Sequence, residues 1–164
     1  MSLAPRDATP PPRATRAETN AVSTLVIVGI AAVIAGGLIA AVTDPLRLAD
    51  GSWAAAYLVL VWGVAQVAIG AAQYLLAIAP SARMTWSLFA LWNAGNAAVL
   101  IGTLVAAPGA VVGGSVLLLV ALVAAFVSVR GSLRRVWAGL YRALVVVLFV
   151  SVFVGIALSF VRHS

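Results

Sequence analysis

The sequence predicts an all-α fold: a polytopic integral membrane helical bundle of five transmembrane helices, with the N-terminus inside and the C-terminus outside. Of 164 residues, 64% are hydrophobic and only 9% are charged, which is too little polarity to cover a soluble globule. Long uncharged stretches recur along the chain, and about 20 apolar residues cross a hydrocarbon core of ~30 Å. The arginines between these stretches fall mainly on alternate sides.

The N-terminal segment, residues 1–20, differs in composition from the rest of the chain. It is rich in proline and arginine and has almost no bulky apolar side chains, so it predicts a disordered cytoplasmic tail. Residues 21–164 then form the transmembrane domain, and residues 21–42 form its first span. This apolar run is longer than the core of a signal peptide, about 7–15 residues, so we expect it to be retained.

The later spans are separated by charges and by proline. The second span is predicted at residues 53–79, before Pro80. Residues 84–129 carry no charge, and as one helix they would be ~69 Å long, more than twice the membrane core. Pro108 and Gly109 divide this stretch into spans at 86–107 and 110–129. The fifth span is predicted at 143–161.

The distribution of arginine supports five spans and sets the orientation. With five spans, one side of the membrane holds eight arginines and the other holds two, Arg47 and Arg162. A single span over residues 84–129 would divide them five against five. Because short cytoplasmic loops carry an excess of positive charge, the uneven division is favoured. The eight arginines expected inside are Arg6, Arg13, Arg16, Arg83, Arg130, Arg134, Arg135 and Arg142.

The absence of ionisable side chains argues against chemistry within the bundle. The five predicted spans contain no Asp, Glu, Lys, Arg or His, whereas proton relays and ion sites nearly always use such groups. The chain has no cysteine, and its one histidine is the penultimate residue, His163. We therefore expect no enzymatic activity, no cofactor and no metal site. The net charge of +6 is spread over short loops, which indicates contact with the lipid bilayer and not with nucleic acid.

Four amide side chains form the candidate ligand-binding site. Gln66 and Gln73 share one helical face, and Asn93 and Asn96 share another. Gln73 lies six residues before the end of one span, and Asn93 lies seven residues after the start of the next, so we expect them at similar depth and in side-chain reach. Two interpretations stay open: polar bonds that hold the helices together, or a pocket for a neutral ligand or lipid headgroup.

The last internal loop predicts contact with anionic lipid. Its apolar residues recur at helical spacing, with arginines on the other side of the wheel. Such a basic amphipathic segment can bind lipid phosphates at the cytoplasmic face, although it can also be simply the start of the fifth span. The arginines concerned are Arg130, Arg134, Arg135 and Arg142.

These features predict a non-enzymatic small multi-pass membrane protein that acts as an accessory or scaffold subunit or as a lipid-interacting module. The alternative is a small carrier or binding protein for an uncharged solute or lipid, with the amide cluster as its site. Glycine-rich helix faces allow close packing against another span, another membrane subunit or a second copy of the chain. The use of arginine without lysine indicates a GC-rich bacterial genome, so we expect a multi-pass protein of the bacterial cell membrane.

Overall fold

A computed structural model describes residues 15–75 and 81–128, together with Gly139 and Val146. Helix α1 forms the first span, and α4 and α5 form the third and fourth. Between α1 and α4, three helical segments follow one another without a break and make up the second span. The bounds are α1 Arg16–Leu46, α2 Gly51–Ala56, η1 Tyr57–Val64, α3 Ala65–Leu75, α4 Ala82–Leu104 and α5 Pro108–Ser128.

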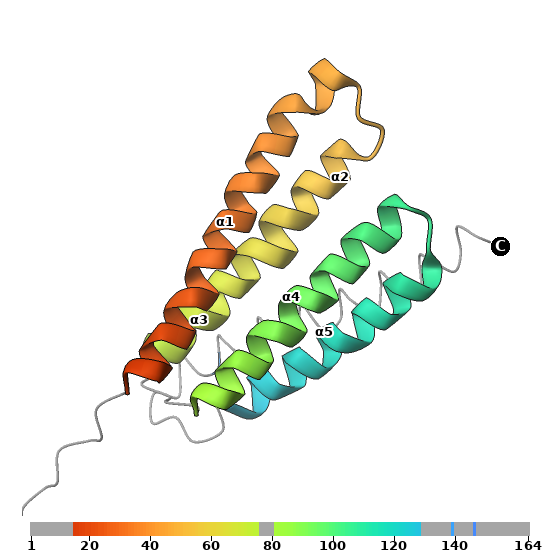
Figure 1. Ribbon diagram of the computed structural model, residues 1–164. Coiled ribbons are helices and arrows are strands. Elements are labelled where there is room, and N and C mark those ends of the chain that lie inside the picture. Colours follow the sequence, from red (N-terminus) through yellow and green to blue (C-terminus); the bar gives the residue numbers. More distant parts are fainter. Residues whose placement is uncertain (1–14, 76–80, 129–138, 140–145, 147–164) are drawn as a thin grey trace, which may run out of the picture.

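The helices form two antiparallel hairpins, α1 with α2–η1–α3 and α4 with α5 (Figure 1). The hairpins meet through α1, η1 and α4, and they diverge towards the α1–α2 and α4–α5 loops. Among the described residues, four helices are long and apolar enough to cross a membrane. The predicted division of residues 84–129 into two helices is therefore confirmed, and each of the two is long and apolar enough to cross a membrane. Of the predicted fifth span, only Val146 lies within the described residues.

Two helices begin earlier than predicted because local capping groups start them. Thr15 and Glu18 form a capping box, in which the Glu18 carboxylate accepts from the Thr15 N–H at 2.8 Å. Residues 16–20, which we assigned to the tail, are thus the first turn of α1, while residues 1–14 lie outside the described residues. Similarly, the Ser81 hydroxyl accepts from the Met84 N–H, and α4 begins at Ala82 instead of residue 86.

Two helices end in the same motif, with a non-glycine residue in the left-handed conformation. At the end of α4, Ala106 has φ 52°, and the Ala107 N–H donates to the Gly102 carbonyl at 2.7 Å. At the end of α1, Arg47 has φ 49°, and the Leu48 N–H donates to the Thr43 carbonyl at 3.0 Å. These are Schellman motifs, in which the residue in the left-handed conformation is usually glycine. They stop α1 before the loop and α4 just before Pro108.

The eight-residue η1 segment is a π-helix, which the sequence did not predict. The Ala65 N–H donates to the carbonyl of Leu60, five residues back, instead of four as in an α-helix. Most π-helical segments are single turns, and they occur frequently at functional sites. The unusual winding therefore marks this part of the second span for closer inspection.

Glycine contacts hold each hairpin closely together. A Cβ atom added to Gly63 would lie 2.8 Å from the Gly29 carbonyl oxygen, and one added to Gly95 would lie 2.9 Å from the Gly114 carbonyl oxygen. No other residue fits at these two crossings, so the backbones approach closely as in other small-residue interfaces of membrane helices. These predicted glycine faces pack against spans of the same chain.

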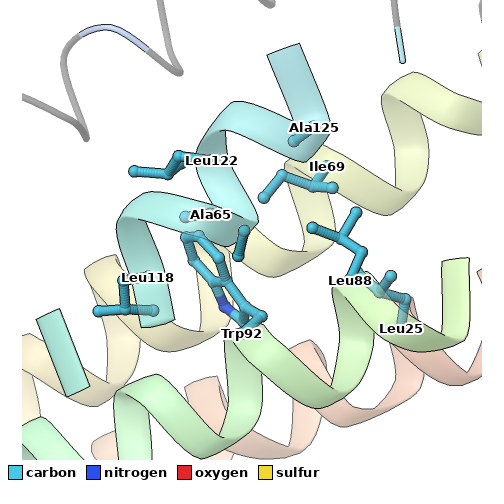
Figure 2. Packing of buried hydrophobic residues seen from close by; sticks show 9 residues of the cluster. Leu25, Ala65, Ile69, Leu88, Trp92, Leu118, Leu122 and Ala125 are labelled. Carbon is cyan, nitrogen blue, oxygen red and sulfur yellow. The ribbon is translucent and has the colours of Figure 1, made fainter. Parts of the chain in front are cut away.

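The apolar core lies where the two hairpins meet. Leu25 of α1, Ile69 of α3 and Leu88 of α4 lie next to one another, and Trp92 packs against α5 beside Leu118 (Figure 2). Among the described residues, Trp92 is the largest fully buried side chain, with 2% of its surface exposed. It therefore fixes the separation of α4 from its neighbours. The remaining members of the cluster are Ala65, Ala121, Leu122 and Ala125.

Candidate functional site

The two predicted asparagines bond to aromatic side chains of the second span. The Trp62 indole Nε1 donates to Asn93 Oδ1 at 2.8 Å, and the Tyr57 hydroxyl donates to Asn96 Oδ1 at 2.9 Å. Each asparagine also donates from Nδ2 to the carbonyl four residues earlier in α4, at 2.8 Å and 2.9 Å. Both amide oxygens and one N–H of each amide therefore have partners within the chain.

The π-helical winding of η1 brings the two aromatic donors onto the face of α4. Tyr57 and Trp62 are five residues apart, and in an α-helix five residues rotate a side chain about 140° away from the starting face. In a π-helix, residues five apart are joined by a hydrogen bond, as residues four apart are in an α-helix, so they lie on the same side of the helix. Asn93 and Asn96, three apart on α4, also share a face. The local change in winding thus aligns two donors with two acceptors.

A third bond completes this contact. The Trp92 indole Nε1 donates to the main-chain carbonyl of Trp62 at 3.3 Å. We call Tyr57, Trp62, Trp92, Asn93 and Asn96 the indole–amide ladder. Its side chains connect η1 to α4 over roughly one helical turn, and no charged group takes part. What it provides is orientation and register between two spans, because each bond requires one particular partner at one particular height.

This register corrects the predicted position of Gln73. Asn93 lies opposite Trp62, and Gln73 lies eleven residues further along the second span, roughly 16 Å at 1.5 Å per residue. The expectation that Gln73 and Asn93 share one depth is wrong. One cause is the start of α4: it begins at Ala82, four residues before the predicted boundary, so Asn93 lies eleven residues from that end of the helix instead of seven. Residues 76–80, where the second span was predicted to end, lie outside the described residues.

The glutamines lie on the face of α3 that meets α1 and α4, and they are incompletely bonded. Gln66 Nε2 donates to the Leu25 carbonyl of α1 at 2.9 Å, but Gln66 Oε1 has no partner within residues 15–75 and 81–128. Gln73 Oε1 and Thr85 Oγ1 are also buried without a partner in this part of the chain. The three residues expose 0%, 3% and 1% of their surface. We call Gln66, Gln73 and Thr85 the unpaired polar trio.

Sequence reasoning missed four participants in these contacts: Tyr57, Trp62, Trp92 and Thr85. Thr85 had a weak signal, because it shares one face of α4 with Leu88 and Trp92 at the i, i+3, i+7 spacing. Tyr57 and Trp62 had none, since at α-helical spacing they point in different directions. The four candidate lipid-binding arginines, Arg130, Arg134, Arg135 and Arg142, lie outside the described residues.

The described residues show no group of three or more His, Cys, Asp or Glu side chains that could hold a metal ion. Comparisons with protein families, with curated proteins and with solved structures found no match to this chain. Functional interpretation therefore depends on the two sets of polar contacts and on the exposed surface.

Proposed function

We propose that this chain is a non-enzymatic multi-pass membrane protein that acts as an accessory or scaffold subunit. The observation that carries the proposal is the indole–amide ladder, which uses both asparagine oxygens for contacts between spans. Side chains engaged in this way set the geometry of a bundle and are not free to bind a ligand. The alternative is a carrier for an uncharged solute with all four amides as its site. It is less well supported, because Asn93 and Asn96 are engaged by side chains of the second span.

The exposed aromatic residues of the second span support a transmembrane placement. Trp53 near the start of the helix is 39% exposed, and Tyr74 near its last described residue is 77% exposed. They are separated by 21 residues, roughly 30 Å, which matches the hydrocarbon thickness of a bilayer. Tryptophan and tyrosine favour the two membrane interfaces. In the described part of the chain, every charged residue lies at a helix end or in a loop.

The orientation in a cell membrane follows from the eight-to-two division of arginine and stays a proposal, as does the fifth span. A C-terminal alkaline phosphatase fusion should be active, and a C-terminal fluorescent protein that folds only in the cytoplasm should be dark. The reverse result would overturn both the five spans and the N-in, C-out orientation.

The outer face of α1 is the surface on which a partner subunit or lipid would pack. Its large apolar side chains are 47% to 64% exposed. A side chain added to Gly37, on the same exposed part of α1, would meet nothing within 4 Å. The face is therefore smooth at this point and open to a neighbouring helix. The exposed residues are Ile27, Ile30, Ile34 and Leu38.

Purification in mild detergent with mass spectrometry of retained proteins and lipids tests the scaffold role. A stoichiometric protein partner is expected, and Gly37→Leu should reduce its recovery while the bundle still folds. Gly113→Leu is the matched control, because Gly113 on α5 also has nothing within 4 Å of an added Cβ. Recovery of the chain with no protein partner would contradict an accessory role.

The predicted contact with anionic lipid is a separate proposal for the loop that contains Arg134, Arg135 and Arg142. Each arginine near an anionic surface contributes about 1 kcal/mol, and salt weakens the attraction. Neutralising all three should lower the amount of anionic lipid that co-purifies. Unchanged retention would mean that this loop serves only to set the topology.

A further inference from the structure

The unpaired polar trio is the feature that the scaffold role does not explain. Its three oxygen atoms, Gln66 Oε1, Gln73 Oε1 and Thr85 Oγ1, are buried and lack a partner among the described residues. Almost every buried polar group in a folded protein has a hydrogen-bond partner in the protein, in bound water or in a ligand. Within a membrane this requirement is stricter, since lipid tails offer no hydrogen bond.

The trio gathers at one junction of helices. Ile69 of α3 and Leu88 of α4 belong to the same buried cluster, and their side chains lie side by side (Figure 2). Gln66 and Gln73 lie three residues before and four residues after Ile69, on the same face of α3. Thr85 lies three residues before Leu88, on the same face of α4. Gln66 also donates to a carbonyl of α1, so the three oxygens flank the meeting of α1, α3 and α4.

The trio extends from the level of the membrane surface inwards. Tyr74 and Trp86, the sequence neighbours of Gln73 and Thr85, are 77% and 43% exposed, as is typical of aromatic residues at headgroup level. Gln66 lies seven residues further into the span than Gln73, roughly 10 Å. A molecule that contacts all three residues would therefore enter from headgroup level, on the side of the bundle where α1 begins (Figure 1).

We propose that the trio binds an uncharged polyol group, presented either by a hydroxylated lipid headgroup or by a free solute. The two glutamine oxygens can only accept hydrogen bonds, so the ligand must donate. The Thr85 hydroxyl can both donate and accept, and neighbouring hydroxyls of a polyol offer both. In the described part of the chain no charged side chain is buried, so this site contains no counter-charge for an ion. The site shares no residue with the indole–amide ladder and is independent of the scaffold role.

Full-length chain in lipid nanodiscs tests the headgroup source. Native mass spectrometry would compare retained phosphatidylglycerol, whose headgroup carries two hydroxyls, with phosphatidylmethanol, which has the same charge and none. We expect phosphatidylglycerol to be preferred, and Thr85→Val and Gln73→Leu each to reduce that preference about fivefold, as for one lost hydrogen bond. Both replacements remove an unpaired buried polar atom, so the variants should fold. Ser87→Ala, on the exposed side of α4, is the matched control.

Glycerol added to phosphatidylcholine nanodiscs tests the free-solute source. It should raise the unfolding temperature of the wild-type chain and of Ser87→Ala more than that of the Thr85→Val, Gln73→Leu double variant. If the double variant loses the preference for phosphatidylglycerol, the site is supported and its ligand is a lipid headgroup. If the double variant loses the glycerol effect, the ligand is a free polyol. If both measurements are the same in the wild type and the double variant, the trio binds water alone and the proposal is wrong.

Discussion

Breaking the bond between Tyr57 and Asn96 tests whether the indole–amide ladder stabilises the bundle. Tyr57→Phe removes only the hydroxyl that donates to Asn96 Oδ1 at 2.9 Å, and it leaves that oxygen buried without a partner. Asn96→Leu removes the acceptor and leaves the hydroxyl unpaired. Each single change should lower the free energy of unfolding by about 1–2 kcal/mol, from the lost bond and the uncompensated polar group.

The double variant decides between this bond and general packing. When both partners become apolar, no polar group is left unpaired, so the double variant should be no less stable than the worse single variant. Hydrogen bonds between membrane helices give a mean coupling energy of ~0.6 kcal/mol and a maximum near 1.7 kcal/mol. Because Asn96 is fully buried, with 0% of its surface exposed, we expect a value above that mean, about 1 kcal/mol.

Reversible unfolding in bicelles, followed by steric trapping, would measure the four stabilities of this cycle. Tyr74→Phe is the matched control, because Tyr74 is 77% exposed, and it should change stability by less than ~0.5 kcal/mol. Additive single effects, with a coupling energy below ~0.3 kcal/mol, would refute the view that the ladder holds the second and third spans in register.

Three further predictions concern packing, register and a helix end. Gly63→Ala should destabilise the α1 hairpin, because its Cβ would lie 2.8 Å from the Gly29 carbonyl oxygen, whereas Gly113→Ala should be neutral in the same unfolding assay. In this cysteine-free chain, the pair Trp62→Cys and Asn93→Cys should crosslink, and the pair Gln73→Cys and Asn93→Cys should not; the opposite pattern would exclude the register described here. Ala106→Gly should raise the free energy of unfolding by about 1 kcal/mol by relieving the left-handed conformation at φ 52°, and an unchanged or lower stability would contradict this.

Apolar length and proline were enough to predict the division into helices. Pro108 does begin α5, and α4 ends at Leu104, so a turn at residues 105–107 divides the uncharged stretch as its length required. The helix starts were placed too late, although their signals are present in the sequence. Thr15 with Glu18 is a capping box, and Ser81 is a preferred N-cap residue. These capping residues lie before the apolar stretches, so the helices begin earlier than hydropathy alone indicates.

The partners of the amides could not be predicted in the same way. Spacing assigns Asn93 and Asn96 to one helical face, but the depth of one helix against another depends on where both helices end and on how they wind. The contact between Trp62 and Asn93 sets the register, and α4 begins four residues earlier than predicted; together they separate Gln73 from the asparagines. The π-helix had no sequence signal either, since residues 57–64 are apolar apart from their two aromatic donors.

The π-helix and the ladder are best understood together. A π-helical segment is less favourable than an α-helix of the same sequence, so an eight-residue segment requires compensation from elsewhere in the structure. The bonds of Tyr57 and Trp62 to α4 are compensation of this kind, because this winding brings both donors to the same side of the second span. The asparagines thus have a structural role: they stabilise the irregular backbone of η1 and fix the register of the two helices. Gln66 and Gln73 have no comparable role, because their side-chain oxygens have no partner among the described residues. The amides that the sequence groups as one cluster therefore divide into two sets, and the glutamine set, extended by Thr85, is the one whose buried oxygens have no partner among the described residues.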